Sequence, residues 1–298
     1  MLGLRRHYSV PLPNGASLVL GERTLVMGVL NLTPDSFADG GQFVDPERAV
    51  DEALRMEEAG ADIVDIGGES TRPGAEAVDA AEERRRIEPV FERLAGRIRI
   101  PLSIDTYKAE VAEAALDRGA LIVNDISALR YDSGLASLVA QRGAAVVLMH
   151  NRGRSREMYR EAGYVDVARE VAGELRERLA FAEAAGIERE RILVDPGIGF
   201  AKRAEHSLAL LAGLRELETL GRPVLVGPSR KSFMKAALGE RNADQRDWGT
   251  AAAVTTVVSA VLSRSRKRSN MMSVPCTSTV SHVSSRAAVA SVSAPWSS

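Results

Sequence analysis

Seven short apolar runs, each followed by a segment with helical periodicity, constrain the fold of this chain more than any other feature. The runs are rich in Val, Ile and Leu and do not alternate with polar residues, which indicates strands buried on both faces. Between them, stretches such as 46–59 and 108–118 place apolar residues at three- and four-residue spacing among charges, as amphipathic helices do. Alternating strands and helices predict a parallel sheet, either a closed barrel or a doubly wound open sheet. The predicted strands are Thr24–Leu30, Asp62–Ile66, Ile100–Ile104, Leu121–Asn124, Ala144–Met149, Arg191–Val194 and Pro223–Val226.

Polar residues at the ends of these runs distinguish the two folds. In a barrel the carboxyl ends of all strands meet on one face, whereas an open sheet concentrates its polar ends near a single crevice. Almost every run here ends in chemically active residues, so the sequence predicts a (β/α)₈ TIM barrel. A barrel of about 250 residues fits within the 298 residues of the chain. The polar ends are Asn31, Asp65–Arg72, Asp105, Asn124-Asp125, His150, Asp195 and Ser229–Lys231.

The two ends of the chain differ from this pattern. Tyr8–Leu20 predicts an N-terminal β-hairpin about a Pro-Asn-Gly turn, which would close the bottom of the barrel. Residues 1–262 are expected to form the barrel domain. From Ser263 the chain becomes rich in serine and lacks acidic residues, so 263–298 is predicted to be a disordered tail. Met271–Cys276 is the only candidate for an eighth strand, and we expect the eighth strand and its helix to be defective or disordered.

Composition limits the partners. A net charge of −1 provides no field for nucleic acid or an acidic membrane surface. No apolar run approaches the ~20 residues that span a bilayer, and the N-terminus has no secretory signal pattern. The single cysteine, Cys276, forms no intrachain disulfide, and no metal-ligand spacing indicates zinc. A cytoplasmic protein without nucleic-acid or membrane partners is expected.

Three strand ends carry groups suited to a flat heterocycle. Asp105 and Asp195 can each accept two parallel hydrogen bonds from a ring N–H and an adjacent amino group, and Asn124 offers both a donor and an acceptor. With Lys231 nearby they predict a site for a nitrogen-rich, guanidine-like ring. The structural alternative is that they cap helices, which is plausible for Asp105.

Two glycine-containing loops are candidate anion sites. In the segment Asp65–Gly74, glycines allow backbone amides to approach an anion, and Thr71 and Arg72 add a hydroxyl and a fixed charge. Gly227–Ser232 joins a strand to a helix start, where free amides favour a carboxylate or phosphate. Either loop could instead be an ordinary strand–helix connection.

Other candidate residues lie nearby. Phe200 ends an Asp-Pro-Gly turn, where its ring could pack on an aromatic substrate or in the core. Met149 is a candidate pocket floor, and His150 is interpreted as structural. The loop 31–37 has turn formers and hydroxyls, so it could move and close.

Taken in order, these motifs resemble those of the dihydropteroate synthases. The resembling segments run from about Leu25 to about Val254. They are VMGVLNLTPDSFADGG, DIVDIGGESTRPGA, PLSIDTYK, LIVNDIS, VVLMH, ILVDPGIGF and PVLVGPSRKSF.

The resemblance implies a transferase of folate biosynthesis. In it, p-aminobenzoate displaces pyrophosphate from the methylene carbon of (6-hydroxymethyl) 7,8-dihydropterin pyrophosphate and forms 7,8-dihydropteroate. It also implies Mg²⁺ as cofactor, held at Asn31, and a homodimer. By resemblance, Asp105 and Lys231 are catalytic. The implied pterin ligands are Asp105, Asn124, Met149, Asp195 and Lys231; the pyrophosphate ligands are Asn31, Thr71 and Arg72; the p-aminobenzoate pocket is Phe37, Thr71, Pro73, Phe200 and Ser229.

The C-terminus departs from the family pattern. The eighth strand of the family carries an Arg-x-His pair followed by Asp-Val, which binds pyrophosphate, and His282 here has no Arg two residues before it. A catalytically impaired pterin-binding homologue is therefore one alternative. A second is a pterin-dependent methyltransferase, which would share the pterin ligands but would not need the ESTRPG and SRK anion sites.

Overall fold

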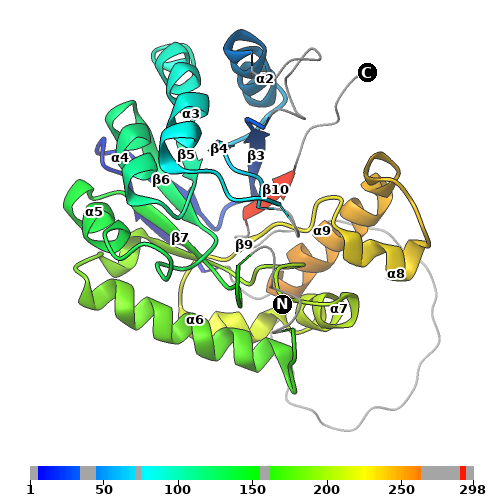
Figure 1. Cartoon of the computed structure of the whole chain (residues 1–298). Helices are drawn as coiled ribbons and strands as arrows, with labels where there is room; N and C mark the ends of the chain where they lie inside the picture. Colours follow the sequence, from blue (N-terminus) through cyan, green and yellow to red (C-terminus); the bar gives the residue numbers. More distant parts are fainter. Residues whose placement is uncertain (1–5, 34–44, 72–74, 155–161, 263–288, 293–298) are drawn as a thin grey trace, which may run out of the picture.

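A parallel sheet forms the centre of the computed structural model, which describes residues 6–33, 45–71, 75–154, 162–262 and 289–292. Within these residues, eight parallel strands follow the order β8-β7-β6-β5-β4-β3-β10-β9 (Figure 1). The two outer strands meet, because Val194 pairs with Val224 and its N–H donates to Pro223 O at 3.0 Å. The sheet closes on itself, and the predicted barrel is confirmed.

The strands and helices alternate along the chain as predicted, with boundaries that differ by one or two residues. The predicted helices 46–59 and 108–118 correspond to α2 (Pro46–Glu58) and α4 (Ala109–Asp117). The barrel strands are β3 (Leu25–Asn31), β4 (Ile63–Gly67), β5 (Leu102–Asp105), β6 (Ala120–Asp125), β7 (Ala145–Met149), β8 (Ile192–Asp195), β9 (Leu225–Val226) and β10 (Val289–Val292). The α-helices are α2 (Pro46–Glu58), α3 (Ala80–Leu94), α4 (Ala109–Asp117), α5 (Leu135–Arg142), α6 (Val167–Ala184), α7 (Ala204–Ala212), α8 (Lys235–Leu238) and α9 (Asp247–Leu262). Short 3₁₀ segments are Arg189–Arg191, Leu214–Leu220, Ser232–Met234 and Ala243–Arg246.

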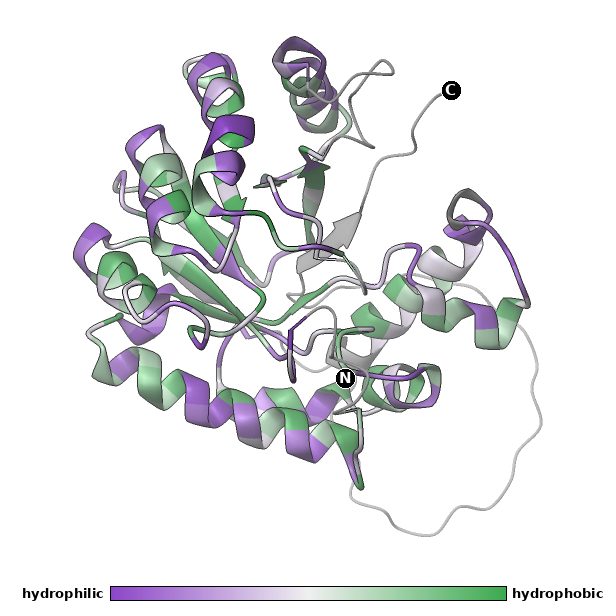
Figure 2. Cartoon of the chain, in the orientation of Figure 1, coloured by the Kyte–Doolittle hydropathy of each residue, from purple (hydrophilic) through white to green (hydrophobic). Residues whose placement is uncertain are grey.

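The strands lie between an inner and an outer apolar layer, which explains why they do not alternate with polar residues. Every residue of β4, β7 and β8 is buried. Figure 2 shows the sheet largely hydrophobic and the helices, α6 most clearly, striped with hydrophilic residues. In α2, Ala49, Val50 and Ala53 are fully buried against the sheet, and the side chain of Asp45 caps the helix by accepting from Glu47 N.

The N-terminal hairpin closes the bottom of the barrel, as predicted. β1 (Tyr8–Pro11) pairs antiparallel with β2 (Ser17–Leu20), and Gly15 supplies the positive φ of +82° that the turn needs. Val10 and Leu20 are fully buried and belong to one apolar cluster with Leu25 and Ile63, which begin their barrel strands. Because strands start at the bottom of a barrel, the catalytic end is left open to the loops.

The eighth strand position is occupied, and this corrects the sequence prediction in one respect. Residues Val289–Val292, inside the predicted tail, form β10, which pairs parallel with β3 and with β9. The strand is four residues long, and its sequence VASV contains neither Arg nor His. The expected candidate, Met271–Cys276, and the helix after the strand lie outside the described residues. The domain boundary at Leu262 stays a prediction.

Candidate active site

Three strand ends form one level of the barrel. Asn31 of β3 is in register with Gly67 of β4, Gly67 with Asp105 of β5, and Asp105 with Asn124 of β6. Gly67 leaves room for the carboxylate beside it, because a Cβ there would lie 3.3 Å from the Asp105 Cβ. The fold therefore brings Asn31, Asp105 and Asn124 together at the carboxyl ends of adjacent strands.

A buried carboxylate below this level orients Asn124. The Asn124 amide donates from Nδ2 to Asp65 Oδ2 at 2.8 Å, which leaves its oxygen free to accept from a ligand. Burial raises the pKa of Asp65 to about 6, against the opposing hydrogen bond from Asn124. From the sequence, Asp65 was counted among the polar strand ends but was given no ligand, although an acid inside the apolar strand Ile63–Gly67 was a usable signal.

Two carboxylate oxygens of this site have no hydrogen-bond partner among the described residues. Oδ1 of Asp65 and Oδ1 of Asp105 are buried and make no hydrogen bond to the described part of the chain. Burial, followed by the charge of Asp65, raises the pKa of Asp105 well above its usual value. An unpaired buried acceptor costs about 1–3 kcal/mol, so these oxygens suit a ligand that brings its own N–H donors.

Asp105 does not cap helix α4, so its alternative role as a helix cap is excluded. Helix α4 follows Lys108, and its first amide, Ala109 N, donates to Asp132 Oδ2 at 2.8 Å. Thr106 Oγ1 accepts from Lys108 N at 3.2 Å. Since other side chains satisfy the helix start, the Asp105 carboxylate remains available to a ligand.

A lysine and a second acid lie across the barrel mouth. Lys231 Nζ donates to Ile198 O at 2.5 Å and lies 4.4 Å from the centre of the Phe200 ring. Burial lowers the pKa of Lys231 to about 8, although the nearby charges of Asp195 and Asp105 act to raise it. Burial also raises the pKa of Asp195, against the influence of Lys231. Lys231 is thus the cation on which the charges of both acids act.

The turn after β8 depends on glycine. Asp195 Oδ1 accepts from Gly197 N at 2.6 Å, which closes the start of the turn. Gly197 has φ +65°, and a Cβ there would lie 2.0 Å from His150 O, a contact that backbone atoms cannot tolerate. At Gly199, φ is +81° and a Cβ would lie 3.1 Å from Lys231 Cδ. Both glycines are therefore needed to bring the turn against Lys231.

Of the two cations in the predicted SRK anion site, Lys231 contributes to the site at the barrel mouth and Arg230 does not. Arg230 has φ +53°, donates from its backbone N to Thr250 Oγ1 at 2.9 Å, and pairs with Asp247 at 2.8 Å. Its guanidinium thus holds the start of α9, while Lys231 turns toward the barrel mouth. Ser229 is half-buried, three residues after the end of β9.

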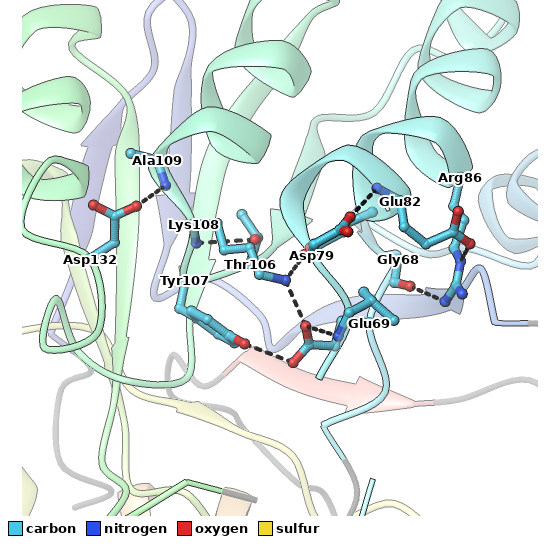
Figure 3. Close-up of polar contacts among 12 residues, drawn as sticks. Gly68, Glu69, Asp79, Glu82, Arg86, Thr106, Tyr107, Lys108, Ala109 and Asp132 are labelled. Atoms are coloured by element: carbon cyan, nitrogen blue, oxygen red, sulfur yellow. Dashed lines mark hydrogen bonds and ion pairs between the residues drawn. The ribbon is translucent and has the colours of Figure 1, made fainter. Parts of the chain in front are cut away.

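The base of the loop after β4 is tied to the end of β5 (Figure 3). Glu69 accepts from Tyr107 OH at 2.9 Å, from Lys108 Nζ at 2.6 Å and from Val78 N at 3.2 Å. Lys108 also pairs with Glu83, in α3, at 2.5 Å. This network, which the sequence analysis missed, joins both sides of the loop that carries Thr71 to the strand that ends in Asp105.

The remaining predicted residues divide into two groups. Met149 is buried and in register with Asp195, so it lies beside Asp195 at the ends of β7 and β8. Asn31 and Thr71 are half-buried at or beyond strand ends. Phe37, Arg72 and Pro73 lie outside the described residues.

Another hollow is a weaker candidate. A pocket of about 440 Å³ opens beside the starts of α6 and α7, lined by Tyr164, Arg169 and His206 among others. It contains none of the converging acids, and two of its charged residues, Asp166 and Arg169, pair with each other at 3.3 Å. The strand-end site therefore has the stronger chemistry.

Comparison with known proteins identifies the family of the chain. Residues 27–266 match the family model described as "Pterin binding enzyme". The chain is 46% identical over 250 residues to a dihydropteroate synthase of Synechocystis sp., covering 84% of this chain and 86% of that one. It is 44% identical over 239 residues to that of Bacillus subtilis, covering 80% and 81%.

Solved structures give the same assignment. The structure resembles Xanthomonas albilineans dihydropteroate synthase with 4-aminobenzoic acid at a TM-score of 0.79 and 41% identity, covering 95% of this chain and 92% of that one. The same enzyme in complex with 7,8-dihydropteroate matches at a TM-score of 0.76 and 39% identity, with the same coverage. The chain therefore belongs to the pterin-binding enzymes and, within them, to the dihydropteroate synthase family.

Proposed function

We infer that this chain is a transferase that joins p-aminobenzoate to the methylene carbon of 7,8-dihydropterin pyrophosphate. The arylamine nitrogen forms a C–N bond, the C–O bond to pyrophosphate breaks, and the new ammonium loses a proton. The products are 7,8-dihydropteroate and pyrophosphate, in folate biosynthesis. The observation that carries this function is the convergence of two unsatisfied acids, an oriented amide and a half-buried lysine at one barrel end.

Asp105, Asn124 and Asp195 are proposed to hold the pterin by its edge, with Met149 beneath it. A pterin presents ring N–H and amino donors, and the buried Oδ1 of Asp105 has no other partner among the described residues. The oxygen of Asn124 would accept from the same ring, since its nitrogen is bound to Asp65. Lys231 would donate to a ring acceptor.

Asp105 and Lys231 are proposed to be the catalytic residues. An arylamine is a weak nucleophile, so the barrier falls most if pyrophosphate leaves early and positive charge spreads into the pterin. The Asp105 carboxylate would stabilise that cationic ring. Lys231, held by Ile198 O, would keep the ring oriented without moving during the reaction.

The pyrophosphate is proposed to bind at Asn31, Thr71 and Arg72, with Mg²⁺ at Asn31. The described residues contain no group of three His, Cys, Asp or Glu side chains that could hold a metal. The donor set fits Mg²⁺ nonetheless, because this ion usually takes one or two protein oxygens and completes its shell with phosphate and water. When bound, it would neutralise charge on the departing pyrophosphate.

The p-aminobenzoate ring is proposed to lie against Phe200 and near Ser229, with Thr71, Phe37 and Pro73 completing its pocket. Phe200 already lies beside Lys231, so an arene there would be next to the pterin edge. This position would set the amine close to the methylene carbon.

Release of pyrophosphate tests this function. Purified chain is mixed with both substrates and Mg²⁺, and pyrophosphate and dihydropteroate are measured together. We expect the two products in equal amounts, and none when either substrate is omitted. Methyl transfer from a methyl-pterin without pyrophosphate release would contradict the assignment.

An impaired homologue is the second candidate, and β10 favours it. The strand at the eighth barrel position reads VASV, without the Arg and His that the family uses on pyrophosphate. Loss of two anion ligands should lower the rate by orders of magnitude, at about 3–4 kcal/mol each. A chimera with an Arg-x-His-Asp-Val strand at this position should then release pyrophosphate much faster than the chain itself. Equal rates would remove this candidate.

A cytoplasmic location and a homodimer are also proposed, on the family resemblance. The described helices include none that is both long and apolar enough to cross a membrane. Sedimentation of the purified chain would determine its oligomeric state.

A further inference from the structure

A buried lysine outside the proposed substrate contacts lies under the turn after β8. Lys202 is 2% exposed, although lysine is rarely buried without a paired charge. Its Nζ lies 2.9 Å from His150 Nδ1, 3.1 Å from Gly197 O and 2.9 Å from Phe200 O. An ammonium has three donors and no acceptor, so each of its hydrogens has one partner.

The two carbonyls bound by Lys202 are at the two ends of the segment Gly197–Phe200. Between them, Ile198 O accepts from Lys231 Nζ at 2.5 Å, and the Phe200 ring lies 4.4 Å from the same nitrogen. The start of the segment is further held because His150 N donates to Asp195 O at 2.8 Å. Lys202 thus binds both ends of the segment that contacts Lys231.

A chain of polar side chains supports Lys202 from α6. Burial, and then the charge of Lys202, lowers the pKa of His150 to about 4, so its ring is neutral at neutral pH. Nδ1 accepts from Lys202, and Nε2 therefore carries the proton and donates to Glu174 Oε2 at 3.2 Å. Arg152 pairs with Glu174 at 2.9 Å and keeps that carboxylate charged.

We propose that Lys202 is a positioning residue: its ammonium shapes the Gly197–Phe200 turn so that Ile198 O and Phe200 hold Lys231 against the substrates. The inference rests on the proposed synthase reaction. Lys202 itself does not touch the substrate, and it acts through the turn.

The charge of Lys202 gives the proposal a pH signature. Burial lowers the pKa of Lys202 to about 7, with Lys231 and Arg152 acting in the same direction and Asp195 and Glu174 opposing them. His150 is neutral beside it, and the Tyr164 ring centre lies 5.9 Å away. A neutral amine has only two hydrogens for three acceptors, so the turn should loosen as pH rises through about 7.

Kinetics of Lys202→Met and Lys202→Gln test the proposal. Lys202→Met should lower kcat/KM by about 10²-fold, as small misplacements of reacting groups do. Its thermal midpoint should change little, because the variant removes the desolvation cost of the ammonium together with its hydrogen bonds. Lys202→Gln keeps N–H donors and should retain more activity. The kcat/KM of Lys202→Met should lose the ionisation near pH 7 and keep the one near 8.

Lys235→Met is the matched control, since the Lys235 side chain is 40% exposed and pairs only with Glu240 among the contacts of the described chain; it should behave as wild type. A folded Lys202→Met with wild-type kcat/KM overturns the proposal. So does a loss of activity with an unchanged pH profile and no recovery in Lys202→Gln. If Lys202→Met does not fold, the activity and pH profile of Lys202→Gln decide.

Calorimetric binding of the dihydropterin pyrophosphate separates the proposed role of Lys202 from the proposed synthase function. A wild type that binds but releases no pyrophosphate contradicts the synthase function, and weaker binding by the variants still supports the role of Lys202.

Discussion

The two sides of the strand-end site satisfy their polar atoms differently. On the acid side (Asp65, Asp105 and Asn124), two carboxylate oxygens are buried and have no partner among the described residues. On the turn side (Asp195, Phe200 and Lys231), Lys231 is bonded to the turn and Asp195 to Gly197 N. The difference indicates that the acid side is completed by the substrate, whereas the protein already holds the turn side in place before the substrate binds.

This division suits an enzyme that must recognise one ring and then stabilise charge on it. Unsatisfied acceptors discriminate strongly for a ligand with matching donors, because any other ligand leaves them unpaired. A pre-formed lysine and aromatic ring need no reorganisation during the reaction. Substitutions on the acid side should therefore act on substrate binding and chemistry, and substitutions on the turn side on the geometry of the site.

The largest effect is expected for Asp105→Asn on the acid side. The amide has the same shape but replaces one acceptor by a donor that would face the donors of the pterin. We expect kcat/KM to fall by about 10³-fold with little change in folding. Steady-state pyrophosphate release measures it, with the exposed Asp117→Asn as control. Wild-type kinetics in Asp105→Asn would remove the acid side from the mechanism.

Gly197→Ala should be the most damaging change on the turn side. The added Cβ would lie 2.0 Å from His150 O, so the turn must move, and we expect about 10²-fold lower kcat/KM. Gly60→Ala is the matched control, because Gly60 has a similar positive φ of +95° and nothing within 4 Å of the added Cβ. Both variants share the backbone strain, about 1–3 kcal/mol in thermal or urea unfolding. Equal losses of activity in the two would show that the contact with His150 is unimportant.

The pH dependence of kcat/KM should report Lys231. Its pKa is lowered to about 8, so Lys231 is charged below that pH and loses its proton as pH rises. We expect kcat/KM to fall by up to about 10-fold per pH unit above 8, through loss of the pterin and carbonyl contacts. A profile measured from pH 5 to 10 that stays level between 8 and 10 would contradict this role.

A smaller effect is expected for Asp65→Asn. The amide can still meet Asn124, but its orientation is no longer fixed, and we expect KM for the pterin substrate to rise about 10-fold. The charge of Asp65 also raises the pKa of Asp105, so removing it should move the acidic limb of kcat/KM to lower pH. Unchanged KM together with an unmoved acidic limb would show that Asp65 does not act on either neighbour.

Sequence reasoning identified the barrel because its signals are local. Strand runs such as Ala144–Met149 are apolar throughout, and polar residues follow them directly, so both can be read without knowing which strands are neighbours. The same reasoning placed Asp105, Asn124 and Asp195 at strand ends, where the structure has them, and Lys231 in the loop that follows β9.

What the sequence could not predict depends on contacts between distant segments. Asp65 is hydrogen-bonded to Asn124 two strands away, and Lys202 is hydrogen-bonded to His150. No residue spacing along the sequence predicts either pair. In the sequence, Arg230 and Lys231 were equal candidates for the anion site, but in the structure Arg230 pairs with Asp247. β10 was missed because a strand of four small and branched residues in a serine-rich segment gives no distinct pattern.

A crystal structure of the chain with the dihydropterin pyrophosphate tests the central claim most directly. The account predicts the pterin edge within hydrogen-bonding distance of Asp105, Asn124 and Asp195, with Lys231 Nζ on the same ring. A pterin bound elsewhere, such as the hollow beside α6 and α7, with these four side chains unoccupied, would contradict it.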